Sequence, residues 1–149
     1  MDLLHELTRI VAALDTADIP YALAGGWALA VHGAARATTD IDVLVLAEDV
    51  PRVLDAVAPL GFRPEAMPMH FPEGMRIQRV SKIDGTELLT LDLLLVSEDL
   101  RGAWDSRARY EALGTELSVI GRDALIQMKA WAGRPQDLAD IARLEGDDR

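Results

Sequence analysis

The stretch that decides the fold is "YALAGGWALAVHGAARATTDIDVLVL", residues 21–46. Its pattern predicts a short buried strand, a Gly-Gly turn, a helix, and a second strand that opens with Asp-Ile-Asp. Because side chains alternate across a strand, Asp40 and Asp42 project from one face, about 6.6 Å apart. A core strand has no structural use for two carboxylates on one face. The pattern therefore predicts a functional site at the open end of this strand.

A third carboxylate, Asp92, stands alone in the later apolar run "LLTLDLLLV", residues 88–96. A buried charge is costly without a partner, so carboxylates in such runs usually have a cation beside them. Three carboxylates on adjacent strands suit a pair of Mg²⁺ ions that stabilise the attacking and leaving oxygens of a phosphoryl transfer. The Gly-Gly turn fits the same chemistry, because backbone N–H groups at the start of a helix can bind phosphate.

Each of these features also has a structural explanation. An aspartate at a strand end is often a turn former or a helix cap, and a tight strand-to-helix turn needs glycine for its backbone alone. Asp92 has an available partner in Arg79, on the preceding strand of an expected hairpin. The conjunction of a Gly-Gly turn, an Asp-x-Asp strand and a lone later aspartate favours the functional interpretation.

Hydrophobic periodicity and turn residues predict an α/β (α+β) fold, with a small mixed sheet flanked by helices and a C-terminal helical pair. Asp84-Gly85 marks a hairpin turn, Asp49 and Pro51 a helix start, and Gly61 a helix end. The prolines between residues 62 and 74 predict a mobile loop with a short strand. The expected helices are 2–17, 27–35, 49–60, 98–110, 122–133 and 135–145, and the expected strands are 21–25, 41–46, 75–83, 87–96 and 116–121.

The chain of 149 residues suits one compact domain over 1–149, with its core at about 21–120 and the C-terminal helices at about 121–145. It contains no cysteine, which removes disulfides and thiolate metal sites. The N-terminal segment lacks a signal-peptide pattern and no run of about 18 apolar residues occurs, so we expect a soluble, cytoplasmic protein without a membrane span. The net charge of −10, from 25 acidic and 15 basic residues, argues against extended contact with nucleic acid.

The motifs together resemble the polymerase-beta-type nucleotidyltransferase superfamily, whose signature is a Gly-Gly or Gly-Ser turn, an Asp-x-Asp strand and a third acid on a later strand. The stretch "GGWALAVHGAARATTDID" is similar to antibiotic nucleotidyltransferases of the aminoglycoside and lincosamide types. It is also similar to minimal bacterial nucleotidyltransferases, including abortive-infection toxins of the AbiE type, which the tail "LIQMKAWAGRPQDLADIARL" resembles more. The superfamily's commoner Gly-Ser is Gly-Gly here, which removes one hydroxyl from the phosphate site.

The resemblance implies roles for the motif residues. Asp40, Asp42 and Asp92 would hold two Mg²⁺ ions, or Mn²⁺, and Asp92 would also orient or deprotonate the attacking hydroxyl. Gly25 and Gly26 would approach the triphosphate of a bound NTP.

Further residues gain implied roles outside the acidic trio. Arg36 and Thr38 would contact phosphate or acceptor, and Lys129 with Asp137 would lie near the nucleotide phosphates. Arg36 is equally suited to the protein surface, and Lys129 to reaching out from an apolar helix. Asp137 also suits the first helical turn after Pro135, where acids complement the helix dipole.

The resemblance implies an enzyme that transfers a nucleoside monophosphate from an NTP to an acceptor hydroxyl with release of pyrophosphate. It would act as the toxin of a toxin–antitoxin pair or as an antibiotic-modifying enzyme, on a protein, a tRNA or a small molecule. A homodimer and a complex with an antitoxin are both open. The alternative is a non-catalytic nucleotide- or partner-binding protein on the same fold, since fold does not fix function. The complete acidic trio favours the enzyme.

Overall fold

The computed structural model describes residues 2–65, 69–70 and 75–146, and it confirms the expected α/β class. The strands form one mixed sheet in the order β3-β5-β6-β2-β1-β8-β7, with β4 also paired to β5. The β2–β6 and β1–β8 pairs are parallel, and the other pairs are antiparallel. The strands are β1 (Ala22–Ala24), β2 (Asp40–Val45), β3 (Arg63–Pro64), β4 (Met69–His70), β5 (Arg76–Asp84), β6 (Glu87–Leu95), β7 (Ala108–Ala112) and β8 (Thr115–Val119).

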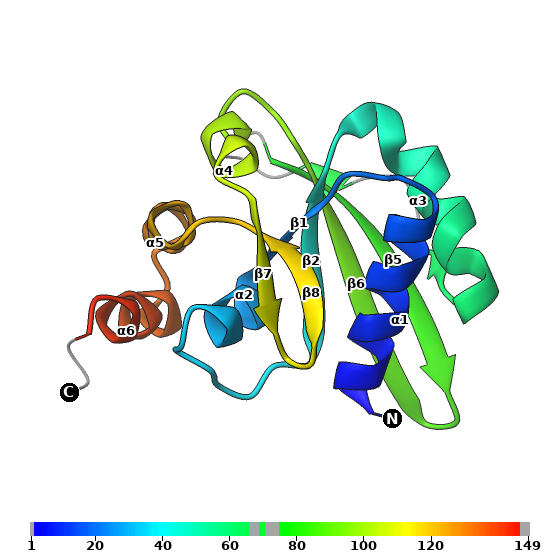
Figure 1. Cartoon of the computed structure of the whole chain (residues 1–149), viewed down its shortest axis with the longest axis horizontal. Helices are drawn as coiled ribbons and strands as arrows, with labels where there is room; N and C mark the ends of the chain where they lie inside the picture. Colours follow the sequence, from blue (N-terminus) through cyan, green and yellow to red (C-terminus); the bar gives the residue numbers. More distant parts are fainter. Residues whose placement is uncertain (1, 66–68, 71–74, 147–149) are drawn as a thin grey trace.

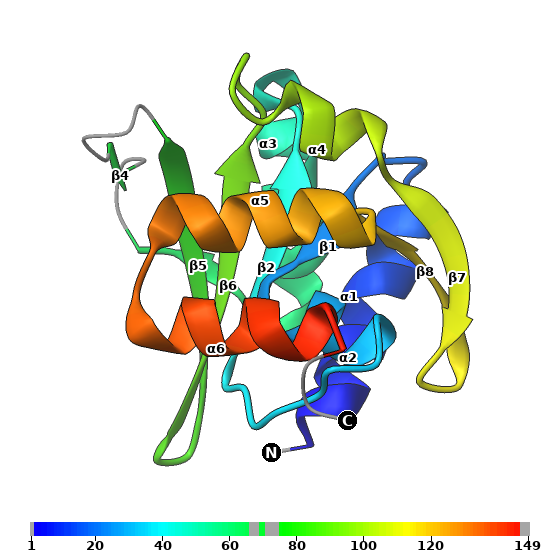
Figure 2. The same ribbon diagram turned by 90° about the vertical axis from the view of Figure 1, so that its left-hand side faces the viewer.

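Helices cover both faces of the sheet. Figure 1 shows α1 and α3 on one face and α2, α5 and α6 on the other. In the turned view of Figure 2, α5 and α6 run side by side across the central strands. The helices are α1 (Leu3–Thr16), α2 (Gly25–Val31), α3 (Val50–Val57), α4 (Arg101–Asp105), α5 (Arg122–Ala132) and α6 (Pro135–Leu144), with short 3₁₀ turns at Ala47–Asp49 and Ala58–Leu60.

Strand β2 passes from solvent into the core along its length. Asp40 at its start is exposed, Asp42 is partly buried, and Leu44 is fully buried. Leu7, Ile10 and Leu14 recur at helical spacing on α1 and are fully buried, as its amphipathic pattern predicts. The two aspartates therefore lie at the open end of a strand whose other end is fixed in the core.

The helix expected at 98–110 is wrong in its second half. Helix α4 ends at Asp105, and Ala108–Ala112 forms β7, which pairs with β8 through a tight turn at Leu113-Gly114. Both turn residues have positive φ, 56° and 80°, as a two-residue hairpin turn requires. The expectation missed the turn, because Leu113 is not a residue that normally signals one.

Two helix starts also differ in detail. Asp49 precedes α3 as expected, but its side chain makes no capping hydrogen bond and instead accepts from Arg52 Nη1 at 3.1 Å. Helix α2 begins at Gly25 itself rather than after the glycine pair. Gly61, with φ of 102°, ends the helical segment after α3 as expected.

Part of the expected loop at 62–74 falls outside the described residues, namely 66–68 and 71–74; β3 and β4 lie in the described part. Within residues 2–65, 69–70 and 75–146, no helix has the length and apolar character needed to cross a membrane.

Candidate active site

The predicted carboxylates lie on two neighbouring parallel strands. Asp42 on β2 pairs with Asp92 on β6, and Asp40 lies one pleat earlier on β2. On the other side of Asp92, the antiparallel pairing of β5 and β6 places Arg79 opposite Asp92. On the other side of Asp42, strand β1 places Ala24 opposite Asp42. Directly paired residues share a face of the sheet. One row across the sheet therefore brings two carboxylates and an arginine together.

Asp92 is only 6% exposed, and Arg79 is its partner. The Asp92 Oδ1 accepts a hydrogen bond from Arg79 Nε at 2.8 Å, and Oδ2 accepts one from Nη2 at 3.0 Å. This bidentate geometry raises the pKa of the guanidinium further, so Arg79 stays charged. The structural explanation considered for Asp92 is therefore present, and both of its oxygens are already bound by a cation of the chain.

Among the residues that the structure describes, Asp42 has no such partner, and its pKa is raised to about 7. Burial is the largest cause, and the charges of Asp92 and Asp40 add to it. The positive charges of Lys129 and Arg79 lower the pKa only in part. A carboxylate that is held away from water beside two like charges is stabilised in its ionised form by any cation that binds there.

The two glycines allow α2 to approach β2 closely. Gly25 has φ of 61°, and a Cβ built on it would overlap with Oδ2 of Asp42. A Cβ on Gly26 would lie 2.6 Å from Oγ1 of Thr38, whose hydroxyl donates to the Asp40 backbone carbonyl at 3.2 Å. A side chain at Gly25 would therefore push α2 away from Asp42, and one at Gly26 would push it away from Thr38.

A buried ion network lies beside the carboxylates, on α5 and α6. Lys129 Nζ lies 3.0 Å from Oδ2 of Asp140 and 3.5 Å from Oδ1 of Asp137. Arg134 binds Asp137 through Nε at 2.7 Å and Nη2 at 3.2 Å. Arg36, on the segment before β2, binds Asp140 through Nε at 3.1 and 3.2 Å. Lys129, Asp137 and Asp140 are all less than a tenth exposed.

The hydrogen bonds in this network decide the charge of Asp137. Burial alone would raise its pKa, but the side-chain and backbone hydrogen bonds from Arg134 outweigh burial and hold the pKa below 3.8. Asp137 also forms a capping box at the start of α6, as its position after Pro135 predicts. Asp137 is therefore ionised at neutral pH.

A cavity of about 190 Å³ separates this network from the carboxylates. Gly25 and Asp42 form one wall, and Lys129, Arg134 and Asp137 form another. The remaining wall is mainly apolar and includes Met75, Ile77, Leu94, Leu125 and Met128. A carboxylate facing two cations across a cavity with an apolar wall is suited to a metal-bound phosphate joined to a flat organic group.

The structure thus brings four of the predicted site residues to one cavity: Gly25, Asp42, Lys129 and Asp137. Asp40, Asp92, Gly26 and Thr38 lie next to this cavity without lining it, and Arg36 faces Asp140. The sequence prediction missed Arg134 and the apolar wall. The Arg-Pro pair before α6 could have indicated Arg134 as a site residue. Pro135 marks the start of a helix, so Arg134 lies beside the free N–H groups of the first turn.

The oxygen donors fit Mg²⁺ bound jointly with a substrate. Among residues 2–65, 69–70 and 75–146, no group of three or more His, Cys, Asp or Glu side chains is arranged to hold a metal ion. Asp40 and Asp42 supply two carboxylates on one face, and Mg²⁺ is usually bound by one or two carboxylates together with substrate phosphates. Asp92 would have to exchange Arg79 for a metal in order to become a third ligand.

The fold is that of a nucleotidyltransferase, and comparison with known proteins agrees. The chain belongs to the aminoglycoside-2''-adenylyltransferase family, whose model matches residues 6–144. This confirms the resemblance to the antibiotic-modifying branch of the polymerase-beta-type superfamily, and the protein is an enzyme with nucleotidyltransferase activity. No curated protein matches the sequence at a significant level.

Several solved structures share the fold. The antibiotic-resistance factor ANT(2'')-Ia, in complex with adenylyl-2''-tobramycin, has a TM-score of 0.65 at 21% identity over 95% of this chain and 86% of that one. The lincomycin-bound lincosamide antibiotic adenylyltransferase LnuA has a TM-score of 0.65 at 17% identity over 95% and 96%. A Thermotoga maritima protein, assigned but not demonstrated as a nucleotidyltransferase, has a TM-score of 0.69 at 15% identity over 99% and 94%.

Proposed function

We propose that this enzyme is an adenylyltransferase that transfers AMP from ATP to a hydroxyl of a small cationic acceptor of the aminoglycoside class. The observation that carries the proposal is the cavity, in which Asp42 faces Lys129 and Arg134. The family assignment supports ATP as donor and an aminoglycoside as acceptor, and the neighbour ANT(2'')-Ia was solved with an adenylylated aminoglycoside.

The cations of the cavity bind the triphosphate. Lys129 Nζ is held beside the cavity by Asp137 and Asp140, and Arg134 is fixed by its bidentate pair with Asp137. Their side chains need little reordering to meet a phosphate, which lowers the entropic cost of binding. Gly25 lies against Asp42 and lines the cavity, so its backbone is placed to approach the phosphates.

Asp40 and Asp42 would hold Mg²⁺, which would neutralise charge on the phosphates and on the leaving pyrophosphate. The raised pKa of Asp42 means that this carboxylate binds a cation with its charge fully available only above about pH 7. The expected metal dependence is therefore steepest near neutral pH.

The chain's residues also order the transfer step. The acceptor oxygen attacks the α-phosphorus, the bond from that phosphorus to the β-phosphate oxygen breaks, and pyrophosphate leaves with its electron pair. Asp92 lies beside Asp42 with both oxygens paired to Arg79, so it would orient the hydroxyl or take its proton only after this ion pair opens. Holding the reactants in line provides much of the rate acceleration in such reactions.

The charge of the chain favours a cationic acceptor over a nucleic acid. With a net charge of −10, long-range attraction draws in polycations and repels tRNA. Together with the family assignment, this favours the antibiotic-modifying hypothesis over the toxin hypothesis, in which the acceptor would be a tRNA or a protein. The exposed Asp40 on the open side of the site contributes to this negative field.

A panel of acceptors tests the proposal directly. The enzyme is incubated with Mg²⁺ and ATP labelled at the α-phosphate, together with tobramycin, lincomycin, bulk tRNA or no acceptor, and the products are identified by mass spectrometry. We expect a tobramycin adduct that carries one AMP and depends on Asp42, since Asp42→Asn removes the cation-binding charge. Label transferred to tRNA or to protein, with none on tobramycin, would overturn the assignment of the acceptor.

A further inference from the structure

Two members of the buried ion network, Asp140 and Arg36, do not line the cavity. Asp140 on α6 is 2% exposed, and its carboxylate is shared by two cations from different parts of the chain. Lys129 Nζ lies 3.0 Å from Oδ2, and Arg36 Nε lies 3.1 Å from Oδ1 and 3.2 Å from Oδ2. A carboxylate in this position cannot reach a bound nucleotide, but it can determine where Lys129 lies.

Asp140 is a closer partner of Lys129 than Asp137 is. The Lys129–Asp137 distance is 3.5 Å, and Asp137 is already bound by Arg134 through both of its oxygens. A buried ammonium moves toward whichever charge remains available. Without the carboxylate of Asp140, Lys129 would move toward Asp137 and out of the position that it holds beside the cavity.

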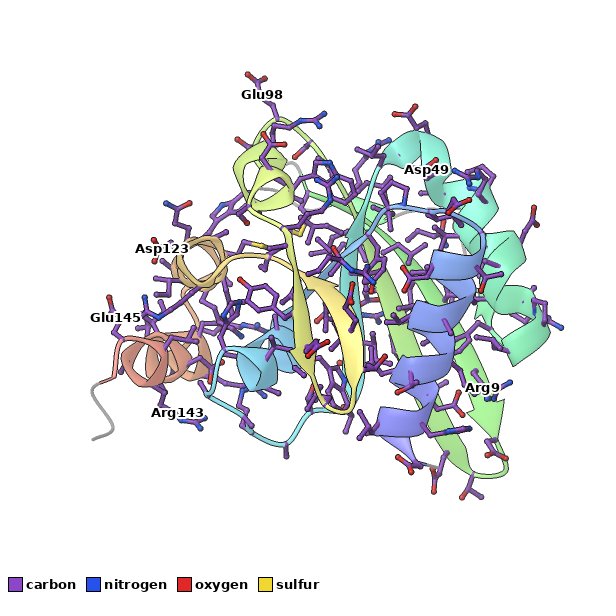
Figure 3. The ribbon with its side chains drawn as sticks, viewed as in Figure 1. Arg9, Asp49, Glu98, Asp123, Arg143 and Glu145 are labelled. Carbon is purple, nitrogen blue, oxygen red and sulfur yellow. The ribbon has the colours of Figure 1, made fainter. Side chains whose placement is uncertain are left out.

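Asp140 also connects α6 to the strand that carries the predicted metal ligands. Arg36 lies on the segment that leads into β2, four residues before Asp40. A second contact between the same elements comes from Arg143, whose Nη2 donates to the Ala35 carbonyl at 2.7 Å. Figure 3 shows Arg143 on α6, at the side where this segment passes. Asp140 therefore contacts both Lys129 and the β2 lead-in, and it shares the second of these tasks with Arg143.

We propose that Asp140 is a positioning residue for nucleotide binding: it holds the Lys129 ammonium at the cavity wall and locks α5 and α6 to the segment before the Asp-Ile-Asp strand. This inference rests on the proposed function, because it assigns Lys129 to the triphosphate. It assigns Asp140 no contact with substrate. It predicts that Asp140 acts on the nucleotide through Lys129 and only when Lys129 is present.

A double-mutant cycle isolates this dependence. Binding of Mg²⁺·ATP is measured by calorimetry for wild type, Asp140→Asn, Lys129→Met and the double variant. We expect each single variant to weaken ATP binding roughly tenfold, the loss typical of removing a hydrogen bond to a charged group. In the Lys129→Met background, Asp140→Asn is expected to change the affinity less than twofold, because the group that it positions is gone.

A matched control removes an exposed carboxylate of the same helical pair, Asp123, whose ion-pair partner is its neighbour Arg122 and not Lys129. The Asp123 side chain on α5 is 92% exposed and points away from the protein (Figure 3). Asp123→Asn changes the net charge by the same amount as Asp140→Asn, so equal losses of affinity in the two variants would reduce the effect to long-range charge and overturn the proposal.

The outcomes separate this proposal from the proposed function. If Asp140→Asn weakens binding equally with and without Lys129, Asp140 is a structural tether and not a positioning residue. If folded wild type binds no Mg²⁺·ATP, the proposed function itself fails. If Asp140→Asn does not fold, Asp140→Glu takes its place in the cycle, because glutamate keeps the charge and moves the carboxylate by one methylene. Wild-type affinity for Mg²⁺·ATP in the Asp140→Glu variant would also contradict the proposal.

Discussion

Replacing Asp42 by asparagine is expected to make the protein more stable at pH 8 while removing its transferase activity. Burial, followed by the charges of Asp92 and Asp40, raises the pKa of Asp42 from 3.8 to about 7. Between these pH values the folded protein holds a proton that the unfolded chain has already released. The free energy of unfolding therefore falls as the pH rises through this interval, and it levels off above about pH 7.

The pKa values of the two states set the size of this effect. A change from 3.8 to about 7 corresponds to about 4 kcal/mol of lost stability, at 1.36 kcal/mol for each pKa unit. Asparagine has nearly the same shape and carries no charge, so it removes this loss. We expect Asp42→Asn to exceed wild type by about 2–4 kcal/mol at pH 8 and by less than half as much at pH 5, which lies only about one unit above the unfolded pKa.

Urea unfolding followed by circular dichroism, in the presence of EDTA, measures this difference at both pH values. The exposed Asp123→Asn variant serves as the control and should stay within about 0.5 kcal/mol of wild type at pH 5 and at pH 8. An Asp42→Asn protein that is no more stable than wild type at pH 8 would refute the reasoning, since it would mean that the carboxylate is not desolvated.

Two further substitutions follow from the same geometry. Gly25→Ala should lower the free energy of urea unfolding by about 3 kcal/mol or more, because a Cβ would overlap with Oδ2 of Asp42. Gly85→Ala should lower it by only about 1 kcal/mol, since Gly85 has a similar φ (64° against 61°) and open space around it. Equal losses of stability in the two variants would show that the close approach is unimportant. Arg79→Met should lower the free energy of unfolding by about 2 kcal/mol, because it leaves the buried Asp92 without its guanidinium partner. The same substitution at the exposed Arg76, on the same strand, should leave the stability unchanged. Similar melting temperatures for the two variants would contradict the role of the Arg79–Asp92 ion pair.

The sequence was sufficient for the elements in which local pattern and tertiary structure agree. The alternation in β2 places Asp40 and Asp42 on one face, and the Asp84-Gly85 turn produces the β5–β6 hairpin that brings Arg79 opposite Asp92. In β7 the local sequence pattern and the tertiary structure disagree. Its residues, "ARYEA", suit a helix as well as a strand, and only their pairing with β8 makes them a strand.

The partners of the charged residues could not be predicted from sequence in the same way. Nothing local to Arg36 indicates that its guanidinium binds Asp140, more than a hundred positions later, and not a phosphate. Arg79 was foreseen as a structural partner of Asp92, and the hairpin register places it there, but the choice between this ion pair and a metal ion depends on the positions of the side chains, which no local pattern specifies. The apolar wall of the cavity joins residues of β5, β6 and α5 that no single motif contains.

The most direct test of the account is a calorimetric titration of Mg²⁺·ATP into wild type and into the Asp40→Asn/Asp42→Asn double variant. Since the Asp42 substitution is expected to stabilise the fold, lost binding in the double variant cannot be attributed to unfolding. The account predicts binding by wild type that disappears with EDTA and in the double variant. Equal binding by both proteins, or none by folded wild type, would contradict the claim that these carboxylates hold a metal-bound triphosphate.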